Sequence, residues 1–361
     1  MFFMKDDYVM SKLKIGIIGT GSISHVHIKP YLENPDVELY ALCDINEKRL
    51  NSVAEQYGVS RKFTDYNEML KLPELDAVSV CTWNSMHAPC TIAALNAGKH
   101  VLCEKPMAMN SSEAIAMKEA ADRNGKLLMI GFVRRFGNDC VILKDFINAG
   151  DFGEIYYAKA CYLRRKGSPG GWFGDKSRAG GGPLIDLGVH VIDFVRYLMG
   201  NPKPISVYGA TFNKLHDRRN IKGNSGWISS EISSTDIFDV EDLASAMIRF
   251  DNGAVLVVDA SFSLNIKEDK GDIELFGTKS GAILNPDLEI YTEMNDYLTN
   301  VKLDMKTALE FEGLFDNEVN HFVDCLKNGI VCRSPAEDGV ELMKILDAVY
   351  ESARIGHEVI I

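Results

Sequence analysis

The first third of the chain alternates short apolar runs with amphipathic stretches, and no other feature of the sequence constrains the fold more. The amphipathic stretches have helical periodicity. Apolar strands that are separated by helices need cover on both faces of the sheet that they form. The alternation therefore predicts an α/β domain built on a doubly wound parallel sheet. The expected strands are 13–18, 37–43, 77–81, 100–103 and 127–130, and the clearest helices are 46–57, 87–97 and 112–124.

Beyond residue 136 the pattern favours a second sheet that is largely antiparallel. Asn252-Gly253 joins the strand-like runs 243–250 and 254–262, and Asn-Gly between β-rich runs is a strong hairpin signal. A second hairpin is expected around Lys279-Ser280-Gly281. We expect an α+β domain with a large open, mostly antiparallel sheet. Its further strands are 154–163 and 205–212, its covering helices are 139–149, 187–199 and 317–327, and a last helix follows at 337–354.

The chain shows no internal repeat and no Pro/Ser-rich linker, so two domains with a tight junction are expected. Residues 11–133 form the predicted dinucleotide-binding domain, and 134–336 the substrate-binding and oligomerisation domain. Residues 1–10 are predicted to be a disordered extension. The least patterned stretch, 213–234, is predicted to be a long surface loop that edges the site or a subunit interface.

Charge and hydropathy exclude several classes of protein. The formal net charge is −12, with 39 Lys and Arg against 51 Asp and Glu, so nucleic acid and anionic membrane surfaces are disfavoured partners. No window approaches the roughly 18 to 20 apolar residues of a membrane span. Residues 1–10 carry Lys5, Asp6 and Asp7 where a signal peptide needs an apolar core. We therefore expect a cytoplasmic protein that acts on a small molecule.

The cysteines do not suggest a disulfide framework or a metal site. All eight are scattered, and no two form a Cys-x-x-Cys pair. We expect reduced thiols that pack as small hydrophobic side chains, and no metal. A zinc site at His25 and His27 is disfavoured because residues two apart on a helix face different directions.

A glycine-rich loop directly after the first strand is typical of a dinucleotide site. Gly19, Gly21 and Ser24 fill the small-residue positions of the fingerprint, and the loop residues Ser22 and Ile23 can offer backbone N–H groups to the pyrophosphate. Asp44, at the end of the second strand, is the expected partner of the adenosine ribose. Its carboxylate favours NAD over NADP. Because Arg49 could instead neutralise a 2′-phosphate, NADP stays open.

Two further polar clusters follow the strands 77–81 and 100–103. The first contains Thr82, Asn84 and His87, and the second contains Glu104 and Lys105. Ligands of doubly wound sheets bind at the carboxyl ends of the strands. These clusters therefore predict a nicotinamide-ribose site in the same crevice as the glycine loop.

The second half contributes a Gly-Gly-Gly-Pro segment that leads into Asp186 and His190. If a helix begins at Asp186, the two side chains are i, i+4 neighbours and form a carboxylate–imidazole pair. The alternative, an N-cap aspartate and a partly buried histidine, remains open. The candidate substrate contacts are Arg134, Arg164 and Trp172. Two structural alternatives remain: Arg134 and Arg135 could form salt bridges at the domain junction, and Trp172 with Phe173 could anchor a loop.

Taken together, these motifs resemble those of the Gfo/Idh/MocA oxidoreductases, the glucose–fructose oxidoreductase and inositol dehydrogenase family. The matching segments are 19–24, 82–87, 104–106, 131–136 and 181–190. The resemblance implies a Rossmann domain and a C-terminal open-sheet domain that forms dimers or tetramers, with the helix 337–354 packing back on the first domain. It also implies that Lys105 is a catalytic lysine fixed by Pro106, Asp186 a substrate-positioning carboxylate and His190 an acid/base. Trp83 departs from the family's Thr-Pro-Asn pattern.

The sequence therefore predicts an NAD(H)-dependent dehydrogenase that oxidises a secondary hydroxyl of a sugar, sugar derivative or inositol. Activity should rise with pH through about 6.5, the usual histidine pKa, shifted by Asp186. Two alternatives remain. The first is a glycoside-cleaving enzyme that uses transient oxidation by tightly bound NAD. The second is a non-catalytic dinucleotide-sensing regulator of the same fold.

Overall fold

The computed structural model describes residues 12–361, apart from 216–217, 219–220, 223–226, 230–231, 233–234, 285–286 and 312. The extension predicted at 1–10 and part of the predicted surface loop at 213–234 lie outside the described residues. No helix in the described part of the chain is long and apolar enough to cross a membrane.

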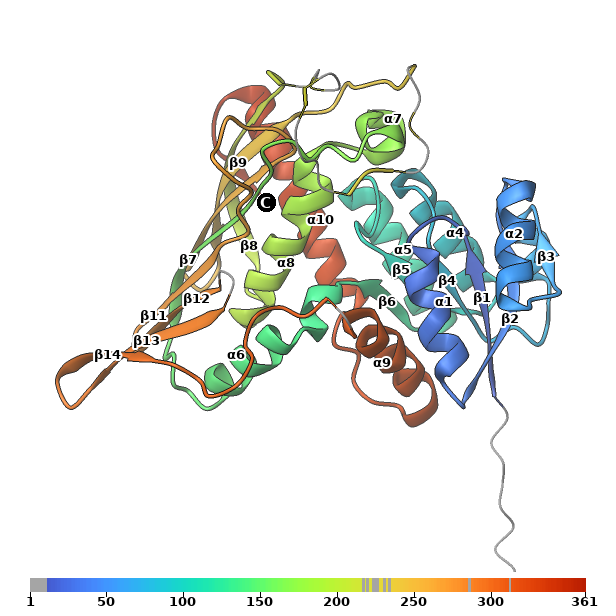
Figure 1. Cartoon of the computed structure of the whole chain (residues 1–361), viewed down its shortest axis with the longest axis horizontal. Helices are drawn as coiled ribbons and strands as arrows, with labels where there is room; N and C mark the ends of the chain where they lie inside the picture. Colours follow the sequence, from blue (N-terminus) through green and yellow to red (C-terminus); the bar gives the residue numbers. More distant parts are fainter. Residues whose placement is uncertain are drawn as a thin grey trace, which may run out of the picture.

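The first half forms a six-stranded, all-parallel sheet with the strand order β3-β2-β1-β4-β5-β6, which confirms the predicted doubly wound architecture (Figure 1). The order reverses between β1 and β4, and this switch point is where such sheets bind ligands. The strands are β1 (Leu13–Ile18), β2 (Val37–Cys43), β3 (Lys62–Phe63), β4 (Ala77–Val80), β5 (His100–Glu104) and β6 (Leu128–Gly131). The helices are α1 (Ser24–Glu33), α2 (Glu47–Tyr57), α3 (Tyr66–Leu70), α4 (Asn84–Asn96) and α5 (Ser111–Asn124).

The second half forms a nine-stranded sheet with the order β14-β13-β12-β11-β7-β10-β9-β8-β15. Every neighbouring pair is antiparallel except β7 and β10, so the predicted open, mostly antiparallel sheet is confirmed. Both predicted hairpins form, β9–β10 at Asn252-Gly253 and β11–β12 just before Ser280. The strands are β7 (Ile155–Leu163), β8 (Pro204–Phe212), β9 (Leu243–Phe250), β10 (Val255–Ser261), β11 (Ile273–Gly277), β12 (Ser280–Leu284), β13 (Leu288–Met294), β14 (Tyr297–Val301) and β15 (Val359–Ile360).

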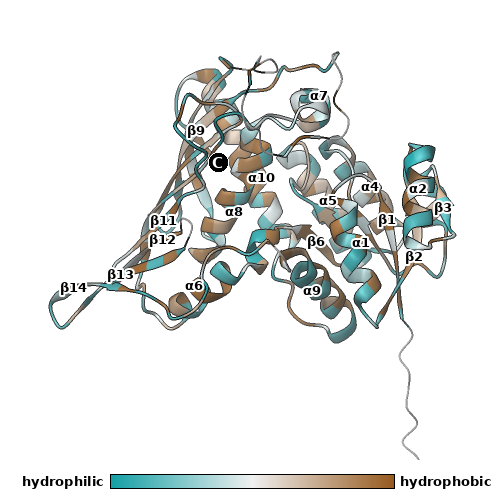
Figure 2. Cartoon of the chain, in the orientation of Figure 1, coloured by the Kyte–Doolittle hydropathy of each residue, from teal (hydrophilic) through white to brown (hydrophobic). Residues whose placement is uncertain are grey.

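Helices cover one face of this large sheet. The helices α8 (Val189–Leu198) and α10 (Ala336–Ile355) lie between the two sheets, and Figure 2 shows hydrophobic stretches on both. Side chains facing them, such as Val207, Ile248 and Leu256, form a buried row across neighbouring strands. On the opposite face the adjacent side chains Tyr208 and Met247 are exposed. The alternation along each strand therefore separates a core face from an outer face.

The helix α10 contacts both halves of the molecule. It packs along β8 of the large sheet and along α5 of the first half. The helix α9 (Leu314–Asn328), although it comes late in the chain, packs against α1. The domain boundary near residue 133 remains a prediction, because two late segments of the chain lie against the first half.

A buried ionic network joins the segment after β6 to α8 and α10. Arg135, in a 3₁₀ turn (Val133–Phe136), donates from Nε and Nη2 to Asp193 and from Nη1 to Asp338. Arg196 lies 3.4 Å from the other oxygen of Asp338, so the two arginines balance the two aspartates. Of the two roles considered for Arg135, the structure therefore favours the salt bridge at the junction. The helix α6 (Asn138–Asn148) follows directly.

Candidate active site

The glycine loop has the backbone that a dinucleotide site requires. Gly19 has a φ of +92°, and a Cβ there would lie 2.5 Å from the carbonyl oxygen of Cys81. A Cβ at Gly21, in contrast, would have no neighbour within 4 Å. Ser22 and Ile23 follow at the start of α1, where backbone N–H groups point out of the helix. The loop is therefore held tightly against β4 while its outer surface stays open to a pyrophosphate.

Asp44 lies at the end of β2, where the sequence predicted the ribose partner. It accepts hydrogen bonds from Thr20 N and Oγ1 at 2.7 and 2.8 Å and from Asn46 N. Arg49 adds two more, from Nε and Nη2 at 3.0 and 2.9 Å. Although burial opposes it, these bonds, led by those from Arg49, hold the pKa of Asp44 below its usual value. Arg49 thus covers the carboxylate, and a ribose has to share Asp44 with it.

The side chains of the segment after β4 bond mainly to backbone carbonyl groups. The buried His87 has Nδ1 2.7 Å from Pro106 O and Nε2 3.2 Å from Thr82 O, and burial lowers its pKa. Asn84 donates to Ala179 O, and the guanidinium of Arg178 lies 4.5 Å from the centre of the Trp83 ring. His87 and Asn84 were predicted to touch the cofactor. In the structure they connect this segment to its neighbours, and their contact with the cofactor stays a prediction.

Glu104, the last residue of β5, belongs to a buried polar cluster behind the site. Its Oε1 lies 2.8 Å from His27 Nε2, and its Oε2 accepts from Lys105 N. Despite burial, His27 and then Lys105 hold its pKa below the usual value. Glu318 of α9 lies against this pair and is fully buried. Glu104 therefore fixes the backbone of Lys105, and its contact with the cofactor stays a prediction.

Lys105 and Asp186 meet across the two halves of the molecule. The Nζ of Lys105 lies 3.0 Å from Asp186 Oδ1 and 3.2 Å from Asp186 O, and both side chains remain slightly exposed. Asp186 belongs to a π-helical turn (Leu184–Gly188) that precedes α8. The expected Asp186–His190 pair is absent from the hydrogen bonds of the described residues, so that prediction is wrong: Asp186 turns to Lys105 instead.

His190 lies in the first turn of α8 and is partly exposed. Burial is the largest cause that lowers its pKa, which falls well below the usual value of 6.5. The positive charges of Lys105, Arg134 and Arg164 act in the same direction. An uncharged imidazole beside an ammonium group can accept a proton at neutral pH.

Two residues that the sequence analysis missed shape the turn that carries Asp186. Glu241 accepts hydrogen bonds from Gly182 N and Leu184 N, and Tyr350 of α10 donates its hydroxyl to Glu241 at 2.9 Å. A Cβ at Gly181 would lie 2.0 Å from the Tyr350 hydroxyl, and one at Gly182 would lie 2.1 Å from Glu241 O. The glycines thus allow this turn to approach Tyr350 of α10 and the backbone of Glu241 closely. No local pattern in the sequence marks either partner.

Two of the three predicted substrate contacts, Arg134 and Arg164, act electrostatically on His190. Arg134 donates to Asp139 at 2.9 Å, and Arg164 donates to Gly167 O, yet both lie close enough to lower the pKa of His190. Trp172 stacks on Phe173, and Phe173 meets Trp227 edge-on. These rings belong to a short 3₁₀ turn (Gly171–Gly174), next to α7 (Lys176–Ala179). The described parts of the 213–234 stretch lie against this segment, since Ser229 N donates to Pro169 O.

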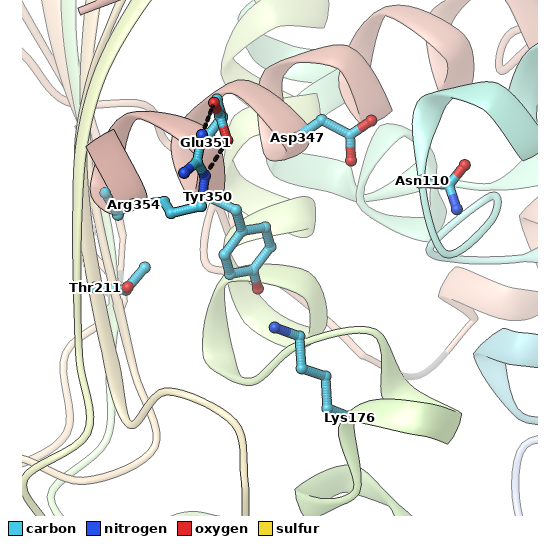
Figure 3. Close-up of a pocket in the computed structure, with 8 residues that line it drawn as sticks. Asn110, Lys176, Thr211, Asp347, Tyr350, Glu351 and Arg354 are labelled. Atoms are coloured by element: carbon cyan, nitrogen blue, oxygen red, sulfur yellow. Dashed lines mark hydrogen bonds and ion pairs between the residues drawn. The ribbon is translucent and has the colours of Figure 1, made fainter. Parts of the chain in front are cut away.

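A hollow of about 620 Å³ lies behind the glycine turn, between α5, α7, β8 and α10 (Figure 3). Tyr350 lines it, and Lys176 reaches toward Tyr350 from α7. The other lining residues are Asn110, Thr211, Asp347, Glu351, Ala353 and Arg354. Neither Lys105, Asp186 nor His190 lines this hollow, so it is separate from the candidate active site.

Comparison with known proteins agrees with this geometry. Residues 13–132 match the family model described as "Oxidoreductase family, NAD-binding Rossmann fold", and 141–283 match the GFO/IDH/MocA C-terminal domain. The D-glucoside 3-dehydrogenase of Escherichia coli K12 is 35% identical over 359 residues, which is 99% of each chain. The chain belongs to the Gfo/Idh/MocA oxidoreductase family.

Two further relatives in the Gfo/Idh/MocA family extend this comparison. The myo-inositol 2-dehydrogenase of Thermotoga maritima is 32% identical over 267 residues, 74% of this chain and 73% of its own. The solved structure of levoglucosan dehydrogenase in complex with NADH and levoglucosan superposes with a TM-score of 0.82 at 25% identity, covering 97% of this chain and 99% of the other. The predicted family, oxidoreductase class and NAD cofactor are confirmed.

Proposed function

We propose that the protein is an NAD(H)-dependent dehydrogenase that oxidises a secondary hydroxyl group of a sugar, sugar derivative or inositol. The observation that carries the proposal is the 3.0 Å contact between Lys105 Nζ and Asp186 Oδ1 at the carboxyl end of β5, with a neutral His190 nearby. An ammonium group, a carboxylate and an uncharged imidazole are the groups that alcohol oxidation needs around its reacting carbon.

Each of the three side chains has a defined task in this reaction. When bound, NAD supplies the acceptor for the hydride that leaves the carbinol carbon. The Lys105 ammonium stabilises the negative charge that develops on the substrate oxygen, and His190 takes the hydroxyl proton. Asp186 holds Lys105 in place and offers its second oxygen to a neighbouring hydroxyl group of the substrate. A polyhydroxylated ring suits this arrangement because it supplies such a neighbouring hydroxyl.

The names of the relatives support a sugar substrate, and they order the candidates to be tested. The relative that matches 99% of both chains is named D-glucoside 3-dehydrogenase, so glucosides come first. Levoglucosan and myo-inositol follow, since relatives named for them match most of this chain. The cytoplasmic location expected from the sequence remains a prediction.

The test is an absorbance assay for NADH formation with methyl glucosides, levoglucosan, inositols and free hexoses, run with NAD and with NADP. The variant Lys105→Met should lower kcat/KM by at least about a hundredfold, because the charge that stabilises the developing oxyanion is lost. Lys176→Met is the matched control, since Lys176 is exposed and lines the separate hollow.

Equal losses in the two lysine variants would refute the assigned roles. Cleavage of glycosides without net NADH formation would point instead to transient oxidation by bound NAD. NADH binding without turnover of any compound, in protein shown to be folded, would refute the dehydrogenase.

A further inference from the structure

Three side chains with metal-ligating atoms come together where α9 ends. His321 and Cys325 lie four residues apart on this helix and therefore share one face. Gly329, with a φ of +65°, ends the helix and turns the chain back, and Cys332 returns toward the same face. The ligand atoms of all three residues lie within 4.8 Å of one another. Nothing in the proposed dehydrogenase reaction uses this cluster.

The spacing of these atoms fits a tetrahedral cation. With Zn–S bonds of about 2.3 Å and Zn–N bonds of about 2.0–2.1 Å, a tetrahedral ion holds sulfur and nitrogen ligands about 3.6 Å apart. Cys325 Sγ lies 3.5 Å from His321 Nε2. Both cysteines are free thiols in the structure, so this separation is not imposed by a disulfide.

The surroundings of the cluster can support a bound cation. Ser334 donates its backbone N–H to Cys332, in the way that backbone groups support zinc-bound thiolates. The three residues are partly exposed, so a hydrated ion can reach them from solvent.

We propose that His321, Cys325 and Cys332 bind one thiophilic divalent cation of the Zn²⁺ type, with water as the fourth ligand. Thiolate and imidazole ligands select such an ion over Mg²⁺ or Ca²⁺. On binding, His321 Nε2 exchanges its hydrogen bond from Arg333 N, 2.9 Å long, for a bond to the cation. The ion ties the end of α9 to the segment before α10, beside the Arg333 carbonyl that accepts from the buried Arg135.

The first probe is Co²⁺, added to the reduced, metal-stripped full-length chain. We expect one equivalent to bind, with the thiolate charge-transfer absorption and the strong visible bands of a tetrahedral ion, and Zn²⁺ to displace it one for one. Cys325→Ser and Cys332→Ser should each weaken binding by at least about a hundredfold, since removing even an outer partner costs 10–100-fold. Cys161→Ser, a partly buried thiol on β7, is the matched control and should bind as the parent does.

A second measurement needs no variant. Zn²⁺ should slow the alkylation of Cys325 and Cys332, mapped by peptide mass spectrometry, and leave the rate at Cys161 unchanged. The proposal is overturned if the reduced chain takes up no Co²⁺, if the spectrum is that of an octahedral ion, or if the folded serine variants bind as tightly as the parent. A Cys325–Cys332 disulfide in protein that takes up no metal after reduction would identify a redox pair in place of the metal site.

Discussion

At the scale of single residues, His190 shows how neighbouring charges set the pH range in which a side chain can accept a proton. The sequence predicts activity that rises through the usual histidine pKa, with a shift set by Asp186. In the structure burial and three positive side chains lower the pKa of His190, while Asp186 is engaged by Lys105. The rise in activity with pH should therefore lie well below pH 6.5, because only the neutral imidazole can take the hydroxyl proton.

Removing one of these charges should move the rise back toward pH 6.5. Arg164→Gln deletes a positive charge that faces His190, so protonation of His190 becomes easier and the acid limb of the kcat/KM profile moves up by about half a pH unit or more. Arg165→Gln is the control, because Arg165 is exposed and plays no part in the shift at His190. An acid limb at the same pH in parent and Arg164→Gln would show that His190 is not the titrating base.

The residue scale also shows what the sequence could and could not predict. Lys105 and Asp186 were both identified from the motifs around them, but their contact joins positions 81 apart in the chain. The local spacing of Asp186 and His190 suggested a different pair. Glu241, which decides the shape of the turn at 184–188, lies more than fifty residues further along and sits in no motif. The local sequence pattern identified the reactive side chains, whereas contacts between distant parts of the chain determine which hydrogen-bond partners they have.

Among the elements, strongly apolar segments were the ones that the sequence predicted well. The strands β1 and β2 have the predicted bounds, because apolar runs between polar turns define them. The strand β3 has only two residues, too few for any periodicity, and the hairpin of β13 and β14 is largely exposed, so its apolar residues do not alternate regularly with polar ones. The regular part of α8 begins at Val189 rather than near Asp186, because Glu241 holds the preceding turn in a wider, π-helical form.

The packing of α9 against α1 and β5 buries a carboxyl group that has no hydrogen-bond partner in the described chain. Both oxygens of Glu318 are enclosed, close to Glu104, His27 and the fully buried Tyr31. Burial first, and then the charges of Glu104 and Asp193, raise the pKa of Glu318 well above its usual value. We therefore predict that Glu318 is protonated in the folded protein at neutral pH, so that folding takes up a proton there.

This proton uptake predicts how stability depends on pH. The unfolded glutamate ionises above about pH 4.5, so its contribution is fully present below that pH and is lost as pH rises toward the folded-state pKa. In Glu318→Gln no ionisable group remains at this position, so this loss of stability with rising pH does not occur. The difference in unfolding free energy between Glu318→Gln and the parent should therefore grow by up to about 1.4 kcal/mol per pH unit.

Urea unfolding at pH 6, 7 and 8 measures this difference. Glu119→Gln, at an exposed position on α5, is the control, and its difference from the parent should stay constant with pH. A constant difference for Glu318→Gln as well would mean that Glu318 is ionised in the folded state.

At the scale of the whole molecule, the uncovered face of the nine-stranded sheet is the surface through which we expect self-association. Helices cover only the opposite face (Figure 1). Tyr208 and Met247 project side by side from the open face and are 52% and 44% exposed. Apolar side chains on a broad, flat sheet favour association with a second copy. We therefore predict a dimer or tetramer formed through this sheet.

Two charges on the paired strands β8 and β9 of that surface should separate the subunits. The double variant Tyr208→Glu/Met247→Glu places two carboxylates on paired strands, where a symmetric interface would have to desolvate them. Light scattering after size-exclusion chromatography should give the monomer mass for this variant and a multiple of it for the parent. Leu32→Glu, on α1 of the other half, is the control and should leave the mass unchanged. A monomeric parent, or an oligomeric double variant, would contradict the prediction.

The position of α10 also fixes the order in which the molecule can be completed during synthesis. All strands of both sheets except the two-residue β15 are synthesised before α10, yet the apolar flanks of α5 and β8 have no cover until that helix has been made. A chain whose translation stalls between β14 and α10 would therefore hold two nearly complete sheets, and the apolar surfaces that α10 covers would be exposed to solvent. Such exposed apolar surfaces promote aggregation. The synthesis of α10 is thus the step that ends the exposure of these apolar surfaces to other chains.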